Sequence, residues 1–141
     1  MIKNSNDLTK IVYDECQKFI PLQHGEKAYC SSVYDGDTIR ICWCDKGINV
    51  KSLCRIDGID TPEIRGSSVF EKDLALQAKK RLSDVVAGKV VTILNPGVEK
   101  YGRILCDIET NEIQSIKDYM LLDSSICKPY LGGKKENWDN S

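Results

Sequence analysis

The first apolar pattern along the chain has the spacing of an amphipathic helix, with apolar residues three or four positions apart. Ser5 or Asn6 can cap its first turn, and Pro21 cannot continue it. The apolar face of this predicted N-terminal helix consists of five residues: Leu8, Ile11, Val12, Cys16 and Phe19. We expect that face to cover apolar surface on the rest of the protein.

Short segments rich in β-branched or aromatic residues follow, and Asp-Gly, Lys-Gly and Pro-Gly turn signals separate them. This pattern is typical of β-strands. It predicts five of them, over residues 28–33, 38–44, 50–57, 89–94 and 103–109.

A longer helical pattern lies between the third and fourth of these strands. It predicts a helix over residues 69–87, which Ser68 and Glu71 can cap and Gly88 can end. A shorter helix is predicted over residues 115–123. Five strands in this order, with a helix after the third, match the OB-fold barrel. We therefore predict an α+β, mostly β fold: a five-stranded OB-fold barrel with flanking helices, plus the N-terminal helix.

Length and composition fit a single domain. The chain has 141 residues, of which 41% are hydrophobic, enough for one modest core. We expect an N-terminal extension and linker over residues 1–24, one domain over 25–135 and a C-terminal tail over 136–141. Charged residues interrupt the first twenty positions, which excludes a signal peptide, and no segment is apolar for long enough to span a bilayer. The expected location is therefore intracellular, in the cytoplasm.

The cysteines indicate thiols and not disulfides. There are seven of them, an odd number, and no secretory signal accompanies them. Cys42 and Cys44 would share one face of a strand, but no second close pair completes a zinc site. We therefore expect reduced thiols.

Three short stretches contain the residues best suited to chemistry. They are Asp35-Gly36-Asp37-Thr38, residues 55–63 and Lys100-Tyr101-Gly102-Arg103. Carboxylate and carbonyl oxygens without nearby imidazole or thiolate select Ca²⁺ or Mg²⁺ over zinc, and a guanidinium group matches the oxygens of a phosphate. This combination indicates a metal-dependent phosphodiesterase that acts on a nucleic acid backbone.

Each stretch also has a purely structural interpretation, because all three contain turn signals. Just before the second predicted strand, however, Asp37 continues the alternation of Ile39, Ile41 and Trp43 and shares their face, which would put its carboxylate at the mouth of the barrel. Arg55 and Asp60 lie an odd number of residues apart, so a straight strand would send them to opposite faces. A bend or bulge at Gly58 can re-aim the second of them.

The overall charge is unusual for a protein that binds nucleic acid. The net charge is −1 and the pI is about 5.9, whereas such binding rests largely on neutralising phosphates. This argues against tight non-specific binding. It is compatible with catalysis, since a bound divalent cation would offset clustered carboxylates.

The order, spacing and types of these residues resemble the staphylococcal nuclease family, and the resemblance runs from about Lys27 to Lys135. It implies three sets of site residues: Asp37, Asp60 and Thr61 as metal ligands, Arg55, Glu63 and Arg103 as catalytic residues, and Lys100, Tyr101 and Tyr130 as substrate contacts. In this set Thr61 contributes its backbone carbonyl, Glu63 handles the attacking water, and the two arginines bind the phosphate. Tyr130 would stack against a base or, alternatively, pack against the barrel.

The resemblance implies a Ca²⁺-dependent nuclease that hydrolyses DNA and RNA with water and leaves 3′-phosphate ends, with Mg²⁺ as a poorer cofactor. The expected partners are single-stranded or frayed DNA and RNA and no membrane, and the expected state is a monomer. The alternative is a catalytically weak or inactive OB-fold module that binds nucleic acid or protein. The chain stops soon after residues 132–135, where the family continues into a C-terminal helix. We expect the N-terminal helix to substitute for that helix.

Overall fold

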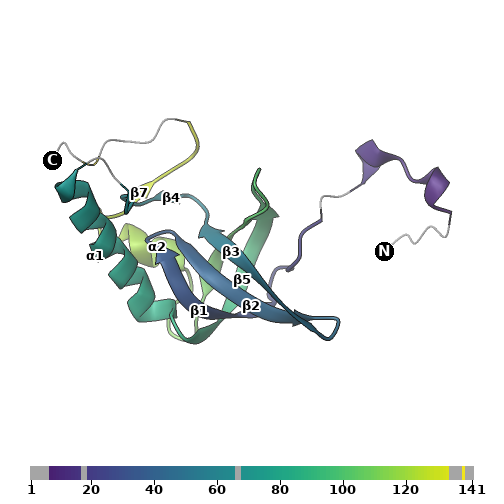
Figure 1. The fold of residues 1–141 in the computed structure, drawn as a ribbon, viewed down its shortest axis with the longest axis horizontal. Coiled ribbons are helices and arrows are strands. Elements are labelled where there is room, and N and C mark those ends of the chain that lie inside the picture. The colour runs from purple at the N-terminus through teal and green to yellow at the C-terminus, as the bar shows by residue number, and fades with distance from the viewer. Residues whose placement is uncertain (1–6, 17–18, 66–67, 134–137, 139–141) are drawn as a thin grey trace.

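Five strands close into a barrel in the order β1-β2-β3-β6-β5 (Figure 1). We analysed a computed structural model, which describes residues 7–16, 19–65, 68–133 and 138. The barrel strands are β1 (Lys27–Asp35), β2 (Thr38–Asp45), β3 (Ile48–Ile56), β5 (Lys89–Val98) and β6 (Ile104–Glu109). All neighbours pair antiparallel except β3 and β6, which are parallel. The predicted mostly β barrel of the OB-fold type is therefore confirmed.

Two helices accompany the barrel, as predicted. α1 (Val69–Val86) begins at Ser68, whose hydroxyl accepts a hydrogen bond from the Glu71 amide, and it packs against β1. α2 (Ile116–Leu121) follows β6 and begins in the same way at Ser115. A two-stranded ladder of β4 (Ile59–Asp60) and β7 (Lys128–Pro129), which the sequence pattern did not predict, lies beside the barrel.

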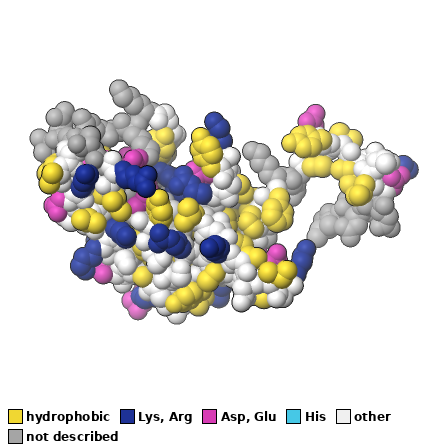
Figure 2. Space-filling view, in the orientation of Figure 1, with side chains coloured by type: hydrophobic (Ala, Val, Ile, Leu, Met, Phe, Trp, Pro, Cys, Tyr) yellow, Lys and Arg dark blue, Asp and Glu magenta, His cyan; other side chains and the backbone are white. Residues whose placement is uncertain are grey.

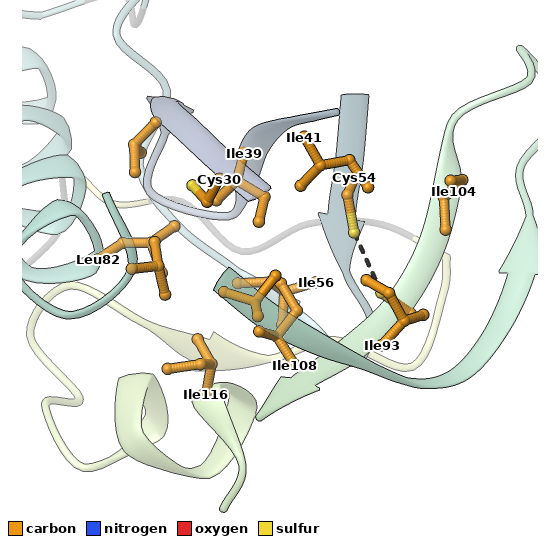
Figure 3. Close-up of a cluster of buried hydrophobic side chains, with 14 of the residues drawn as sticks. Cys30, Ile39, Ile41, Cys54, Ile56, Leu82, Ile93, Ile104, Ile108 and Ile116 are labelled. Carbon is orange, nitrogen blue, oxygen red and sulfur yellow. Dashed lines mark hydrogen bonds between the residues drawn. The ribbon is translucent and has the colours of Figure 1, made fainter. Parts of the chain in front are cut away.

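Isoleucines are the commonest residues of the core, and the alternation of side chains along the strands sends many of them inward. Figure 3 shows Ile39, Ile56, Ile93, Ile104 and Ile108 converging with residues from both helices. Burying one such side chain stabilises the fold by roughly 1.5–3 kcal/mol, so this cluster makes a large contribution to the free energy of folding.

Two core thiols join β3 to β6. The Sγ atoms of Cys54 and Cys106 lie 3.1 Å apart, marked by the dashed line in Figure 3. This hydrogen bond and burial raise the pKa of Cys54 well above its usual range. All seven cysteines of the chain are free thiols.

The N-terminal segment differs from the prediction. Residues Leu8–Lys10 and Tyr13–Glu15 form two separate 3₁₀ turns in place of an amphipathic helix, and residues 17–18 lie outside the described part. The apolar side chains are exposed, 76% for Leu8 and 81% for Phe19. Figure 1 shows this segment leading away from the barrel. The predicted helix, and its role as a substitute for a C-terminal helix, are therefore wrong for the described residues.

The segments next to the barrel contribute two further core residues. Leu22, just before β1, is buried in the core. Trp138 is also buried, with the Lys128 ammonium 4.2 Å from its ring centroid, although the sequence placed it in the tail. Among the described residues, no helix is both long and apolar enough to cross a membrane.

Candidate active site

The turn between β1 and β2 brings Asp37 against the segment that follows β4. A Cβ atom at Gly36, within this turn, would lie 2.7 Å from Ala78 Cβ and 2.8 Å from Thr61 Oγ1. Non-bonded atoms do not approach so closely without a shift, so only glycine fits here. The absence of a side chain lets the turn, helix α1 and Thr61 pack together beside Asp37.

Asp37 is a buried carboxylate with few compensating contacts. It is 8% exposed, its Oδ1 accepts a hydrogen bond from Thr38 Oγ1 at 2.9 Å, and its Oδ2 lies 3.5 Å from Arg55 Nη2. Burial, followed by the neighbouring carboxylate of Asp35, raises the pKa of Asp37 to about 7, and the Arg55 charge opposes this only in part. The site therefore disfavours the ionised form of Asp37 next to Asp35 unless a cation is present.

Arg55 is held in place from behind by backbone carbonyls. It follows Cys54 on β3 and pairs with Thr38 across the ladder. Its Nη2 donates to the Ile59 carbonyl at 3.0 Å, and its Nη1 to the Ile56 carbonyl at 3.5 Å. The guanidinium also lies 5.8 Å from the ring centroid of Tyr130. The fork is thus fixed before any substrate arrives.

Asp60 and Thr61 reach the same region because the chain turns after β3. Gly58 lies between β3 and β4 and has a φ of +82°, a value that glycine tolerates. Asp60 and Thr61 are both buried. Burial and the charges of Asp37 and Asp60 raise the pKa of the buried Cys127 thiol to about 12. The positive φ at Gly58 is the bend that the sequence predicts between Arg55 and Asp60.

Glu63 is the exposed carboxylate of the predicted set. It comes two residues after Thr61, and its backbone N–H donates to Glu71 Oε2 at 3.3 Å. This bond ties the segment to the first turn of α1.

Arg103 lies just before β6, at the end of a tight turn. The turn is closed by the Gly102 amide, which donates to the Glu99 carbonyl at 2.9 Å, and its glycine has a φ of +87°. Arg103 Nη2 pairs with Glu99 Oε2 at 3.0 Å. Lys100 and Tyr101 project from the turn and are exposed, with the ammonium 5.6 Å from the Tyr101 ring centroid.

These residues meet around one cavity of about 350 Å³. Five of the nine predicted site residues line it: Asp37, Arg55, Thr61, Glu63 and Arg103. The other four, Asp60, Lys100, Tyr101 and Tyr130, do not line it. Asp37 and Arg103, which are sixty-six positions apart in the sequence, thus line the same cavity.

The comparison with protein families agrees with this arrangement. A family model described as staphylococcal nuclease homologue (SNase) matches residues 54–123. The chain belongs to this family. The relationship is therefore to nucleases. A search of curated proteins found no match. The matched span begins after Asp37 and ends before Tyr130, so the fold, and not the match, brings these two residues to the SNase segment.

Sequence reasoning missed several residues of the cavity wall. Tyr34, Asp35 and Arg65 line it together with Pro62 and Ile64. Asp35 belongs to the first of the three predicted stretches but has no role in the predicted site, although its place two positions before Asp37 could have indicated a carboxylate pair. The cavity lining contains three acidic side chains and three arginines, so acidic side chains do not outnumber basic ones there as they do in the whole chain.

The donor set suits a hard divalent cation. Two buried carboxylates, Asp37 and Asp60, and the backbone at Thr61 offer oxygen alone, the ligand type that Ca²⁺ and Mg²⁺ prefer. The described residues contain no group of three His, Cys, Asp or Glu side chains placed to hold a metal, so a carbonyl or water must complete the shell. The unfavourable burial of the Asp37 charge is what a cation would relieve.

Proposed function

We propose that the chain is a Ca²⁺-dependent nuclease that hydrolyses phosphodiester bonds of single-stranded DNA and RNA. The observation that carries this proposal is the convergence of Asp37, Arg55, Glu63 and Arg103 on one cavity. A site that only binds nucleic acid has no use for buried carboxylates beside phosphate, since they repel it.

We assign Asp37, Asp60 and the Thr61 carbonyl as the oxygen donors that would hold a metal ion. When bound, it would supply Lewis acid chemistry, drawing electron density from a phosphate oxygen. Ca²⁺ accepts the irregular shells that two carboxylates, a carbonyl and water provide, whereas Mg²⁺ demands near-octahedral geometry. Ca²⁺ is therefore the proposed cofactor.

Glu63 would accept a proton from the attacking water. It is an exposed carboxylate that lines the cavity, accessible to water and substrate. The oxygen of that water forms the new bond to phosphorus. The bond to the 5′-oxygen breaks, that oxygen takes up a proton, and a 3′-phosphate remains.

Arg55 and Arg103 would stabilise the negative charge that grows on the phosphate during attack. Arg55 donates hydrogen bonds to two backbone carbonyls, which fix the plane of its guanidinium group. Arg103 is held by its ion pair with Glu99. Preorganised donors of this kind typically contribute 10²-fold or more to the rate. We assign Lys100 and Tyr101, which are exposed on the turn before Arg103, to contacts with a terminal phosphate, and Tyr130, whose ring lies next to the Arg55 guanidinium, to a contact with a base.

The test is hydrolysis of a single-stranded oligonucleotide with Ca²⁺, with Mg²⁺ and with excess chelator. We expect cleavage with Ca²⁺, less with Mg²⁺ and none with chelator. Glu63→Gln should abolish most of the activity, while Glu112→Gln, an exposed glutamate beyond β6, should leave it unchanged. Full activity in chelator would refute metal dependence. Oligonucleotide binding without cleavage by the Ca²⁺-loaded protein would favour the OB-fold binding module instead.

A further inference from the structure

An aromatic residue in the cavity wall has no part in the proposed hydrolysis. Tyr34 lines the cavity and is 44% exposed. In the ladder between β1 and β2, Val33 pairs with Ile39 and Asp35 with Thr38, so Tyr34 is the extra residue of a β-bulge. Bulges re-aim a side chain and are frequent beside active sites.

Arg40 holds the ring of Tyr34 from β2. Its Cζ atom lies 5.1 Å from the ring centroid, a cation–π contact. Its Nη1 donates to Ser32 Oγ at 3.1 Å and to the Val33 carbonyl at 3.4 Å, which fixes the guanidinium. A positive charge therefore lies next to an aromatic residue of the cavity wall, although Arg40 itself does not line the cavity.

The surroundings of the cavity suit a polyanion with flat apolar groups. Figure 2 shows lysine and arginine side chains interspersed with apolar side chains on one face of the molecule. Arg65, in the cavity wall, is exposed as well. Phosphates and bases alternate along a single strand in the same way, and proteins bind such strands by combining basic grooves with aromatic platforms.

We propose that Tyr34 and Arg40 form a nucleobase-stacking subsite beside the scissile phosphate. This inference rests on the proposed function. The base of a nucleotide whose phosphate lies near Asp37 stacks on the Tyr34 ring, which lies three residues away, at most about 11 Å along the chain. Arg40 orients that ring and attracts the adjoining phosphate. Stacking requires an exposed base face, so the subsite selects unpaired strands without selecting their sequence.

Tyr29 provides a matched control within the same strand. It is also 44% exposed and lies on β1, but it does not line the cavity. Tyr34→Ala and Tyr29→Ala therefore remove the same side chain, from the same strand, at the same exposure. Tyr34→Phe keeps the ring and removes only the hydroxyl.

The first measurement is kcat/KM for a short oligothymidylate and for an abasic oligomer of equal length, with Ca²⁺. The wild type should prefer the oligothymidylate, and Tyr34→Ala should reduce that preference roughly 10-fold, the typical effect of one lost base stack. Tyr29→Ala and Tyr34→Phe should keep it. Equal preference in Tyr34→Ala and the wild type would overturn the subsite.

The second measurement separates failure of the subsite from failure of the proposed function. An oligothymidylate that carries 2-aminopurine is titrated with Glu63→Gln protein in Ca²⁺, and stacking quenches its fluorescence. Each further substitution is made in the Glu63→Gln protein. Quenching should be lost when Tyr34→Ala is combined with it and retained when Tyr29→Ala is. With Arg40→Gln, quenching should become weaker and depend less on salt. If the wild type cleaves nothing while this pattern holds, the nuclease proposal fails and the subsite stands. If quenching persists in Tyr34→Ala, the subsite is wrong.

Discussion

Replacing Asp37 with asparagine should stabilise the metal-free protein at neutral and alkaline pH. The folded environment raises the pKa of this carboxyl from 3.8 to about 7, first through burial and then through Asp35. A raised acid pKa means that the folded state holds the proton more tightly than the unfolded chain. The contribution to stability is therefore fully present below about pH 4 and is lost as pH rises to about 7.

The size of this effect follows from the shift in pKa. A difference of about three in pKa corresponds to roughly 4 kcal/mol of unfolding free energy above pH ~7. Asparagine carries no charge and can still accept the hydrogen bond from Thr38. It loses the ion pair with Arg55, whose Nη2 keeps the Ile59 carbonyl. The net gain in chelator at about pH 8 should therefore be up to roughly 4 kcal/mol.

Urea unfolding of both proteins in chelator, at about pH 4.5 and about pH 8, measures this difference. The variant should gain up to roughly 4 kcal/mol at the higher pH and only about 1 kcal/mol at the lower pH. Added Ca²⁺ should stabilise the wild type and do so far less for the variant, since binding to the folded state alone raises its stability. Asp57→Asn, an exposed carboxylate just after β3, is the control and should show neither effect. A variant that is less stable than the wild type at about pH 8 in chelator would refute the reasoning.

Three further predictions follow from the geometry. Arg55→Ala and Arg103→Ala should each lower kcat by about 10²-fold or more with circular dichroism unchanged, because each removes a fixed donor to developing charge, and near-normal turnover in a folded variant would contradict this. Removal of residues 1–16 should shift the melting temperature by no more than about 2 °C, since the described apolar side chains there are exposed and contribute little burial; a sharp loss of stability would show that they pack. Gly36→Ala should cost about 1–3 kcal/mol in urea unfolding and lower activity, because the added carbon meets Ala78 and Thr61, whereas unchanged stability would mean that the turn is loose.

Periodicity along the chain predicted the barrel well. Alternating burial runs through β1 and β6, and the ends of the predicted strands lie within a few residues of those observed. β5 runs four residues past its predicted end at residue 94. Pro96 and Gly97 read as a turn, but here they form part of an irregularity in the ladder with β6, where Asn95 has a φ of +51°.

The N-terminal pattern failed for a physical reason. Apolar residues at helical spacing predict a helix only when a surface is available for them to pack on, because an isolated helix of this length is marginal in water. Leu8 and Phe19 find no such surface, and the described segment forms short turns instead. Tertiary context, which the local pattern does not contain, decided the outcome.

The candidate site was partly predictable because its residues carry distinctive chemistry at fixed spacing. The motifs around Asp37, Arg55 and Arg103 were assigned to a site through their resemblance to the staphylococcal nuclease family, because residue type alone also allows simple turns at these positions. The bulge that places Tyr34 in the cavity wall could not be predicted, since register slips depend on the pairing partner. The β4–β7 ladder was equally hidden, because two-residue strands paired across more than sixty positions leave no periodic pattern.

Cleavage in water enriched in oxygen-18 tests the central claim most directly. A single-stranded oligodeoxynucleotide is incubated with the protein and Ca²⁺ in H₂¹⁸O, and the product ends are analysed by mass spectrometry. The account predicts 3′-phosphate ends that carry one heavy oxygen per cleavage, formed with Ca²⁺ and absent with chelator or with Glu63→Gln. Intact oligonucleotide in the presence of Ca²⁺, or heavy oxygen in 5′-phosphate ends, would contradict it.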